Sequence, residues 1–443
     1  MSDKPKSIFG VVFLTIFLDM VGFSVIFPLF PSMLDHYLAK EGGMGTGILS
    51  GLVSMVEGMG YAGFIQNPAF RLETVIFGGL LGSLYAILQF FFAPIWGGLS
   101  DRFGRRRVLA YTLGGTALGY LLWIFADAFW ILLLSRALGG IASGNLSVAT
   151  AAIADVTSRE NRSKGMAFVG IAFGLGFVLG PALGGIASYW DWSGVKILGF
   201  EMTPFSAAAA VSLFLSVVNW LWLFLRFQET LPEEKRKGRS RVTPAIFGMR
   251  EVGNQAVRKS CLTYLFYMIP FSGMEFTLTF LAVERFSYNA WDLAKMFLLI
   301  GGTLIVVQGV IVRRFVGVVG ERNLAHLGIL VGLGAFLAIA AADTAAVFYP
   351  GLFLMSTGVA LISPTLTALT SLSSDESEQG FNLGVFRSCG SIARAFGPMA
   401  AGLIYFSMGS SVAYIIGAVW LLVPGLILIG VKQPQVLAKA DTC

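Results

Sequence analysis

Two acidic residues lie deep inside long apolar stretches of this sequence, where a charge is unfavourable. Asp19 is near the middle of FLDMVGFSVIFPLFP, and Glu275 is near the middle of PFSGMEFTLTFL. A carboxylate removed from water holds a proton more readily, so both side chains are candidates for binding and releasing a proton. A structural role stays open for both: a carboxyl group hydrogen-bonded in the core for Asp19, and a permanently neutral one for Glu275.

Three arginines are also embedded in apolar stretches. Arg387 and Arg394 lie about two helical turns apart in GVFRSCGSIARAFGP, so a helix places them on one face. Because arginine stays charged, each needs a carboxylate, water or an anionic ligand, and we predict that Arg394 binds substrate or an acidic partner. Arg387 either shares this role or extends to the membrane surface. Arg136, in LLLSRALGGIASGN, is a further candidate, whose alternative is a structural role anchored by backbone carbonyls.

The composition requires a membrane environment for these residues. Of the 443 residues, 56% are hydrophobic and only 13% are charged, which excludes a soluble multidomain protein. The apolar runs are continuous rather than alternating, which excludes a β-barrel and predicts an all-α membrane protein. At about 20 residues per crossing, we expect about 12 spans: Ile8–Leu34, Thr74–Leu99, Val108–Ala126, Phe129–Asp155, Lys164–Ser188, Pro204–Phe227, Ser260–Glu284, Asp292–Val318, Asn323–Ala342, Ala345–Thr370, Gly380–Ser407 and Ser411–Val431.

Basic residues alternate between the predicted loops. The cations gather in every second short loop, which predicts a multi-pass protein of the cell (inner) membrane with both termini in the cytoplasm. The net charge of +6 therefore reports orientation and not nucleic-acid binding. A polar linker at 228–259 divides the chain into an N-terminal bundle, 1–227, and a C-terminal bundle, 260–443. An outer insertion at 35–73 contains Met44–Phe64, which is either an interfacial helix or a long loop.

The two halves are weakly similar to each other. Gly180-Pro181 in the fifth span corresponds to Gly397-Pro398 in the eleventh, and DVTSRENRSKG recurs loosely as SLSSDESEQG. Arg313-Arg314 with Gly320-Glu321-Arg322 is similar to the basic segment near residue 105 without its aspartate. Two related bundles imply a pseudo-twofold axis along the membrane normal and a site between them. In that arrangement Asp19 and Glu275 face each other across a central cavity.

The most specific motif is GGLSDRFGRRRVL, between the second and third spans. Gly97 permits close helix approach, Gly104 permits a tight turn, and Asp101 can pair locally or accept from a helix N-terminus. The order of these residues with Arg102 and Arg105 resembles the corresponding loop of the major facilitator superfamily. This resemblance implies two pseudo-symmetric six-helix bundles, braced by the acid and the arginines in one state of the transport cycle.

Two further motifs extend this resemblance. GLGFVLGPALGG, with Gly180 and Pro181, is similar to the fifth-helix motif of antiporters, and Arg136 with its following glycines to a fourth-helix motif implicated in proton movement. The first half resembles tetracycline-efflux proteins. The second half, through SGMEFTLTFLAVERF and FRSCGSIARAFGP, is similar to the tetracycline-transporter-like (TETRAN) proteins, associated with organic anions. Gly119 stands where tetracycline pumps carry an acid, which argues against recognition of metal–tetracycline.

We therefore expect a monomeric, proton-coupled efflux antiporter for small amphiphilic or anionic organic molecules, working by alternating access. Asp19, Glu275 and Arg136 would couple protons, and Arg394, Arg387 and the same two acids would bind substrate. A lipid or lysolipid translocase on the same fold is the alternative. An enzyme is disfavoured because no nucleophile with a base and no metal-ligand cluster is evident, and no cofactor is expected.

Overall fold

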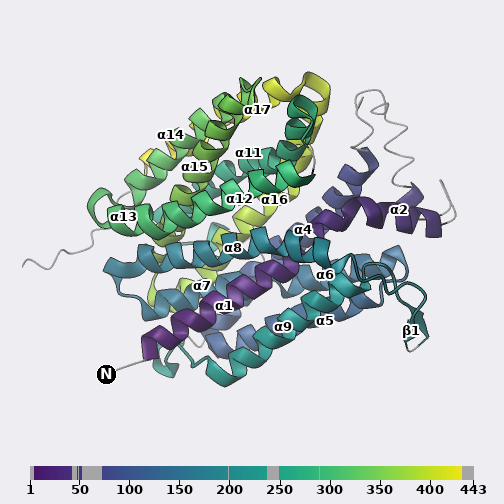
Figure 1. Ribbon diagram of the computed structural model, residues 1–443. Coiled ribbons are helices and arrows are strands. Elements are labelled where there is room, and N and C mark those ends of the chain that lie inside the picture. Colours follow the sequence, from purple (N-terminus) through teal and green to yellow (C-terminus); the bar gives the residue numbers. More distant parts are fainter. Residues whose placement is uncertain are drawn as a thin grey trace, which may run out of the picture.

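The computed structural model describes residues 4–41, 47, 49–51, 72–197, 199–236, 249–288 and 290–431. Most of the segment Met44–Phe64, for which an interfacial helix or a loop was expected, lies outside these residues. The same holds for the middle of the predicted linker. The described chain is almost entirely helical and forms two halves, one drawn in purple to teal and the other in green to yellow (Figure 1).

The first half contains six helical crossings of the bundle. Its elements are α1 (Lys4–Ser24), α2 (Phe30–Lys40), α4 (Leu72–Phe103), α5 (Arg105–Ile124), α6 (Phe129–Ala142), α7 (Asn145–Val156), α8 (Arg162–Ala187) and α9 (Ser206–Arg226). Helices α6 and α7 form one crossing, and α2 extends α1 beyond a break.

The second half repeats this plan. Its elements are α11 (Gln255–Phe286), α12 (Ala290–Val306), a π-helical segment η5 (Val307–Val312), α13 (Arg313–Val319), α14 (Glu321–Ala340), α15 (Ala345–Leu372), α16 (Gln379–Met408), α17 (Ser410–Trp420) and α18 (Leu422–Ile429). One crossing consists of α12, η5 and α13, and the last consists of α17 and α18.

Within the described residues, nine helical stretches are long and apolar enough to cross a membrane. The remaining crossings are α1, α5 and α16, which have 21, 20 and 30 residues. Two of these are more polar, because α5 begins with three arginines and α16 carries Arg387 and Arg394. Together the described helices give the twelve crossings and the all-α fold that the sequence predicts.

Several predicted spans are not continuous α-helices. The prediction of one helix over Ile8–Leu34 is wrong, because α1 ends at Ser24 and a 3-10 turn, η1 (Phe27–Leu29), precedes α2. Pro28 within this turn has no N–H to donate and disfavours helical backbone in the residue before it. The other breaks are at Ser143-Gly144, at the π-helical segment and at Leu421.

Corresponding connections in the two halves have the same backbone shape. Gly104, between α4 and α5, has φ 93° and ψ 155°, and Gly320, between α13 and α14, has φ 82° and ψ 154°. Side chains rarely tolerate this region, so glycine is required at both turns. The loose repeat also folds alike, with the 3-10 turns η3 (Arg159–Asn161) and η6 (Glu376–Glu378) before α8 and α16. The internal repetition seen in the sequence is thus reproduced in the structure.

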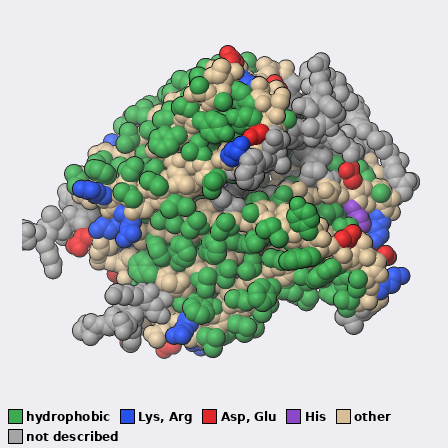
Figure 2. Space-filling view, in the orientation of Figure 1, with side chains coloured by type: hydrophobic (Ala, Val, Ile, Leu, Met, Phe, Trp, Pro, Cys, Tyr) green, Lys and Arg blue, Asp and Glu red, His purple; other side chains and the backbone are tan. Residues whose placement is uncertain are grey.

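Each half has its own apolar core. One large cluster is confined to 252–431, and two others lie within 8–227. A smaller cluster, including Ala167, Val312 and Ala360, joins α8 to η5 and α15 across the halves. Large apolar side chains also cover the outside (Figure 2); for example, Tyr111, Leu225 and Val318 are 72%, 77% and 86% exposed. A surface of this kind is suited to lipid.

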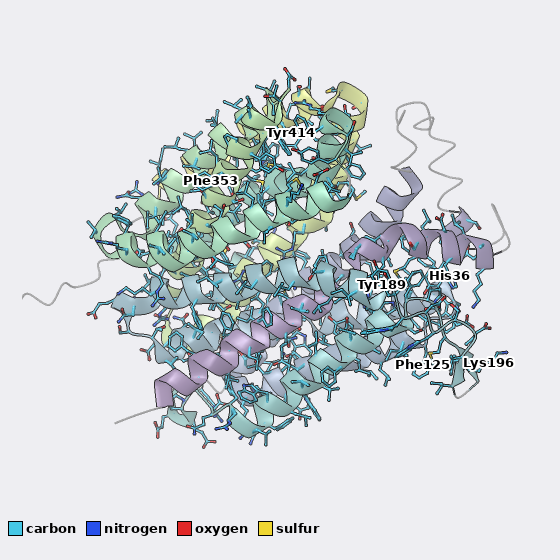
Figure 3. All side chains as sticks on the ribbon, viewed as in Figure 1. His36, Phe125, Tyr189, Lys196, Phe353 and Tyr414 are labelled. Carbon is cyan, nitrogen blue, oxygen red and sulfur yellow. The ribbon has the colours of Figure 1, made fainter. Side chains whose placement is uncertain are left out.

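The two ends of the bundle differ. One end, here called the basic-loop end, carries the Phe103–Arg105 turn and the connection between α15 and α16. The other, the hairpin end, carries a two-stranded antiparallel sheet, β1 (Lys196–Ile197) and β2 (Phe200–Glu201). His36, Phe125 and Tyr189 lie near this hairpin (Figure 3), and Lys40 forms an ion pair with Asp127.

We expect the stability of the protein to depend on pH through His36, which lies at the hairpin end. Burial, and then the charge of Lys40, lower the pKa of His36, against smaller opposing effects of Asp191 and Glu201. A histidine with a lowered pKa stabilises the fold fully above its unfolded pKa of about 6.5, and this contribution is lost as pH falls toward the folded pKa. The unfolding temperature of the wild type should therefore fall from pH 7 to pH 5 relative to His36→Gln. Parallel pH profiles of the two proteins would contradict this.

Candidate functional site

Helices α4 and α16 come from different halves and touch most closely at the basic-loop end. A Cβ on Gly97 would lie 2.1 Å from the carbonyl oxygen of Gly380, and one on Gly384 would lie 2.7 Å from that of Ala93. Any larger side chain at Gly97 would collide with backbone. The glycine that the motif predicts for close helix approach therefore makes its contact across the interface between the halves.

Asp101 binds the N-terminus of α16. Its Oδ1 accepts the N–H of Gly380 at 2.9 Å, and its Oδ2 accepts the N–H of Phe381 at 2.8 Å. Arg105 Nη1 donates to Asp101 Oδ1 at 2.6 Å. The two roles considered for Asp101 thus occur together, and the helix N-terminus, with its positive partial charge, belongs to the opposite half.

Arg105 is the centre of this network and is completely buried. Besides Asp101 it contacts Asp155 Oδ2 at 2.9 Å and Ser100 Oγ at 2.6 Å. Arg102, by contrast, is exposed and lies over the ring of Phe103, with 5.1 Å to the centroid. The arrangement joins α4, α5 and α7 to α16 and closes this end of the interface.

The glycine-rich motif of α8 packs against α1 within the first half. A Cβ on Gly180 would lie 1.9 Å from Ser24 Oγ and 2.7 Å from the carbonyl oxygen of Val21. Pro181 continues within α8 as an internal proline. Gly180 therefore permits the close approach of the helix that carries Asp19.

Asp19 is held by hydrogen bonds inside the first half. Asn145 Nδ2 donates to Asp19 Oδ1 at 2.8 Å and lies 3.3 Å from Thr116 Oγ1. Asn145 begins α7 directly after the break at Ser143-Gly144, so the interruption of this crossing places the amide beside the carboxyl group.

Arg136 is 5% exposed and lies against aromatic rings. Its guanidinium carbon is 4.8 Å from the ring centroid of Trp123 and 5.8 Å from that of Tyr120. In the described part of the chain, its hydrogen bond goes to Ser135 Oγ at 3.3 Å, and Nε has no partner. Anchoring by backbone carbonyls, the structural alternative, is not what these contacts show. Cation–π contacts contribute about 2 kcal/mol when desolvated, whereas burying a charge costs several kcal/mol, so the rings do not balance this cation.

Arg394 links the second half to the first. Its Nη2 donates to Gln89 Oε1 of α4 at 3.1 Å, and Ser391 Oγ donates to the same oxygen at 2.5 Å. Its positive charge also acts on Glu275 of α11. The guanidinium carbon of Arg387 lies 5.8 Å from the ring centroid of Phe386, which stacks on the ring of Tyr264. Glu275 and Asp19 therefore have different partners, in different halves.

Tyr85 and Gln89 of α4 connect these groups. The hydroxyl of Tyr85 experiences the charges of Asp19, Arg136 and Arg394, and Gln89 lies one helical turn further along. Both lie in an apolar run, LLGSLYAILQFFF. Gln89 faces the opposite half, where it contacts Arg394, whereas the Tyr85 ring lies against the first half, 4.8 Å from the ring of Phe23. Sequence reasoning missed Tyr85, Gln89 and Asn145, although polar residues at i and i+4 in such a run were a usable signal.

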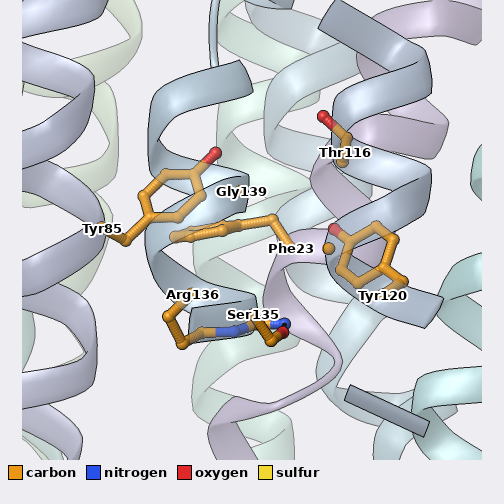
Figure 4. Close-up of a pocket in the computed structure, with 8 residues that line it drawn as sticks. Phe23, Tyr85, Thr116, Tyr120, Ser135, Arg136 and Gly139 are labelled. Atoms are coloured by element: carbon orange, nitrogen blue, oxygen red, sulfur yellow. Dashed lines mark hydrogen bonds between the residues drawn. The ribbon is translucent and has the colours of Figure 1, made fainter. Parts of the chain in front are cut away.

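A small cavity lies beside Arg136 within the first half. It is lined by Phe23, Tyr85, Thr116, Gly119, Tyr120, Ser135, Arg136 and Gly139, with Phe23 between the two tyrosines (Figure 4). Its volume of about 10 Å³ is close to what one water molecule requires. Gly119 lines this space and packs closely on α6, since a Cβ there would lie 3.2 Å from the carbonyl oxygen of Ser135.

Two helical bundles with apolar exteriors, joined by charged and polar groups at their interface, define a membrane transport protein. The chain belongs to the Major Facilitator Superfamily, whose family model matches residues 12–398. It is therefore a multi-pass integral membrane protein and a transporter, not an enzyme, as the sequence predicts.

Relatives and solved structures agree with this membership. Major facilitator superfamily domain-containing protein 10 of Mus musculus is 33% identical over 99% of this chain and 96% of that protein. The class H tetracycline resistance protein of Pasteurella multocida is 28% identical over 94% of this chain and 92% of its own length. The crystal structure of the human organic anion transporter MFSD10 (TETRAN) matches with a TM-score of 0.83 and 31% identity, covering 96% of this chain and all of that chain.

Proposed function

We propose that this protein is a proton-coupled efflux antiporter for small amphiphilic or anionic organic molecules. The observation that carries the proposal is the group of Arg394, Glu275 and Gln89, which lies within the membrane-spanning helices and joins the two halves. Arg394 bonds to Gln89 of the opposite half, and its charge reaches Glu275, so this cation can exchange partners as the halves rock. Alternating access requires such an exchange.

Substrate recognition is assigned to the arginines of α16. Arg394 would bind the anionic group of the substrate, and Arg387, on the same helix face, would supply a second positive charge. The aromatic pair of Tyr264 and Phe386, with ring centroids 4.2 Å apart, offers apolar surface beside Arg387. An organic anion as substrate is supported by the similarity to the human protein described as an organic anion transporter.

Proton coupling is assigned to Asp19 and Glu275, with Arg136 as a positive charge near the first site. Arg394 can stabilise either a substrate anion or the charged form of Glu275, but binding one weakens its hold on the other. Substrate binding would then favour protonation of Glu275, and loss of that proton would favour substrate release. This competition supplies a physical means of exchanging protons for substrate.

The orientation in the membrane is also a proposal. We assign the basic-loop end to the cytoplasm of the cell (inner) membrane, with both termini there, because short basic loops remain on that side. In this assignment the network of Asp101 and Arg105 closes the cytoplasmic end. One chain supplies both halves of the interface, so a monomer suffices for transport.

Replacement of Arg394 tests substrate recognition. Arg394→Gln removes the charge while keeping a hydrogen-bonding side chain, so affinity for organic anions should fall by about 10- to 100-fold. Affinity for neutral amphiphiles should change little. The measurement is stabilisation of the purified protein against heat across a ligand library. The matched control is Arg258→Gln, because Arg258 is an exposed arginine near the start of α11.

Equal loss of affinity for neutral and anionic ligands in Arg394→Gln would contradict the assignment. The same preparations discriminate the lipid alternative. Mass spectrometry should find no lysolipid or phospholipid that is bound stoichiometrically to the wild type and lost from Arg394→Gln. Such a lipid would instead favour a lipid or lysolipid translocase.

A further inference from the structure

The side-chain amide of Asn145 is oriented by two acceptors. Its Nδ2 lies 2.8 Å from Asp19 Oδ1 and 3.3 Å from Thr116 Oγ1. The Thr116 hydroxyl donates its own hydrogen to the carbonyl oxygen of Thr112 at 3.0 Å, so toward Asn145 it is an acceptor. Both amide hydrogens of Asn145 therefore have acceptors, and turning the amide around would place its oxygen against them.

The oxygen of this amide has no donor. Asn145 is 2% exposed, and within the described residues its Oδ1 has no hydrogen-bond partner, although buried polar atoms are almost always paired. Asn219 of α9 also has an unpaired Oδ1, but its Nδ2 donates to the backbone oxygen of Thr15 and not to an acid. Of these two asparagines, Asn145 is the one beside a carboxyl group.

A protonated Asp19 supplies the missing donor. Because Asp19 Oδ1 accepts from Asn145, a proton taken from water binds to Oδ2, where one O–H bond forms and no other covalent bond changes. A carboxylic acid and an amide are complementary. The amide N–H donates to one oxygen of the acid, and the acid O–H donates to the amide oxygen. A charged carboxylate can make only the first of these two bonds.

We propose that Asn145 is a positioning residue for the proton on Asp19, which it holds through a hydrogen bond from the acid O–H to Asn145 Oδ1. The inference rests on the proposed function, which assigns a proton to Asp19, and adds where that proton lies. Proton binding then adds a bond between α1 and α7, at the residue that begins α7 after the break at Ser143-Gly144. Loss of the proton leaves Oδ1 unpaired again.

The other groups around Asp19 keep their protons at ordinary pH. The charge of Asp19 acts on Tyr85 of α4 and Tyr120 of α5, which flank Phe23 in Figure 4, and Arg136 of α6 acts on the same tyrosines. Tyrosine is neutral and arginine is charged near neutrality. Helices α8 and α9 contact α1 through glycine, serine and asparagine residues, which do not titrate. A proton that binds here on acidification therefore binds to Asp19.

Infrared difference spectroscopy of the full chain in neutral detergent tests the pairing. The protein is synthesised with asparagine that carries ¹³C in its side-chain amide, and spectra in acidic and alkaline buffer are subtracted. Acidification should produce the C=O band of a carboxylic acid that is absent from Asp19→Asn. It should also move one labelled amide band to lower wavenumber, because the amide oxygen gains a hydrogen bond.

Replacement of Asn145 identifies the partner. Asn145→Leu is apolar and of similar size, so it should abolish the labelled amide shift and move the Asp19 acid band to higher wavenumber. The matched control is Asn219→Leu, because Asn219 is also buried, bonds to the same helix α1 and has an unpaired oxygen. Both bands should persist in this control. If Asn145→Leu fails to fold, the wild type and Asp19→Asn still decide, because both bands must appear in the first and be absent from the second.

Two results would overturn the proposal. The Asp19 acid band could appear without a shift of the amide band, which would mean that Oδ1 keeps the same partner, such as a bound water, in both states. Alternatively, the acid band could be absent, so that Asp19 binds no proton. Vesicles in which a pH gradient drives no accumulation, made from protein that shows both bands, would refute only the proposed proton coupling.

Discussion

Asp101→Ala should open the basic-loop end of the protein. The substitution removes the acceptor of two backbone N–H groups of α16 and leaves Arg105, which is fully buried, without one of its carboxylates. The pair with Arg105 lies within the first half and is lost in both states, whereas the two hydrogen bonds to α16 exist only in the closed state. At about 1.5–3 kcal/mol per hydrogen bond to a charged group, their loss corresponds to a shift of about 10²- to 10⁴-fold in the balance between closed and open states. The cost falls on the closed state alone, since α16 reaches Asp101 only when the halves meet here.

Spin labels at Arg107 and Asp375 would measure the opening. Both positions are exposed and lie on opposite halves at this end, and the labels should move apart in Asp101→Ala. Glu233→Ala is the control, because the Glu233–Arg236 pair is similar in chemistry but Glu233 is 86% exposed. Exposed pairs contribute about 0–1 kcal/mol, so this variant should leave the distance distribution unchanged. An unchanged distribution in Asp101→Ala would mean that other contacts hold the interface closed.

Glu275→Gln should uncouple transport from the proton gradient. Glutamine has nearly the same shape as glutamate but cannot take up a proton, while Arg394 and Gln89 keep their contact. In vesicles, a pH difference of one unit supplies about 1.4 kcal/mol per proton, enough for about tenfold accumulation of substrate per proton exchanged. The wild type should reach such a ratio, and the variant should equilibrate substrate at a ratio of about one.

The comparison variant is Glu284→Gln on the same helix. Glu284 is hydrogen-bonded to Tyr405 near the hairpin end, away from Arg394, and its replacement should leave accumulation intact. Exchange of labelled for unlabelled substrate should continue in Glu275→Gln, which separates lost coupling from lost binding. Accumulation that survives in this variant and disappears in Asp19→Asn would move the coupling proton to the first half.

Charged residues were the parts of the site that the sequence could reveal. Asp19, Glu275 and Arg394 stand out because a charge in an apolar run is rare and needs a partner. Their partners give a weaker signal, although the spacing of Tyr85 and Gln89 at i and i+4 in an apolar run was usable. Tyr85, Gln89 and Asn145 are uncharged, and such residues occur throughout helix bundles without special consequence. Only the packing of α4 between Asp19 and Arg394 gives Tyr85 and Gln89 their roles.

The sequence by itself determined the number of crossings, the twofold repetition and the family, because apolar length, glycine turns and the basic loop are local features. It also indicated that Asp101 could accept from a helix N-terminus. Tertiary structure decided that this helix is α16 of the other half, that proline breaks the first span after Ser24, and that Arg136 faces a cavity without a carboxylate. These outcomes depend on which helix faces meet, and residues hundreds of positions apart leave no local pattern that specifies their contact.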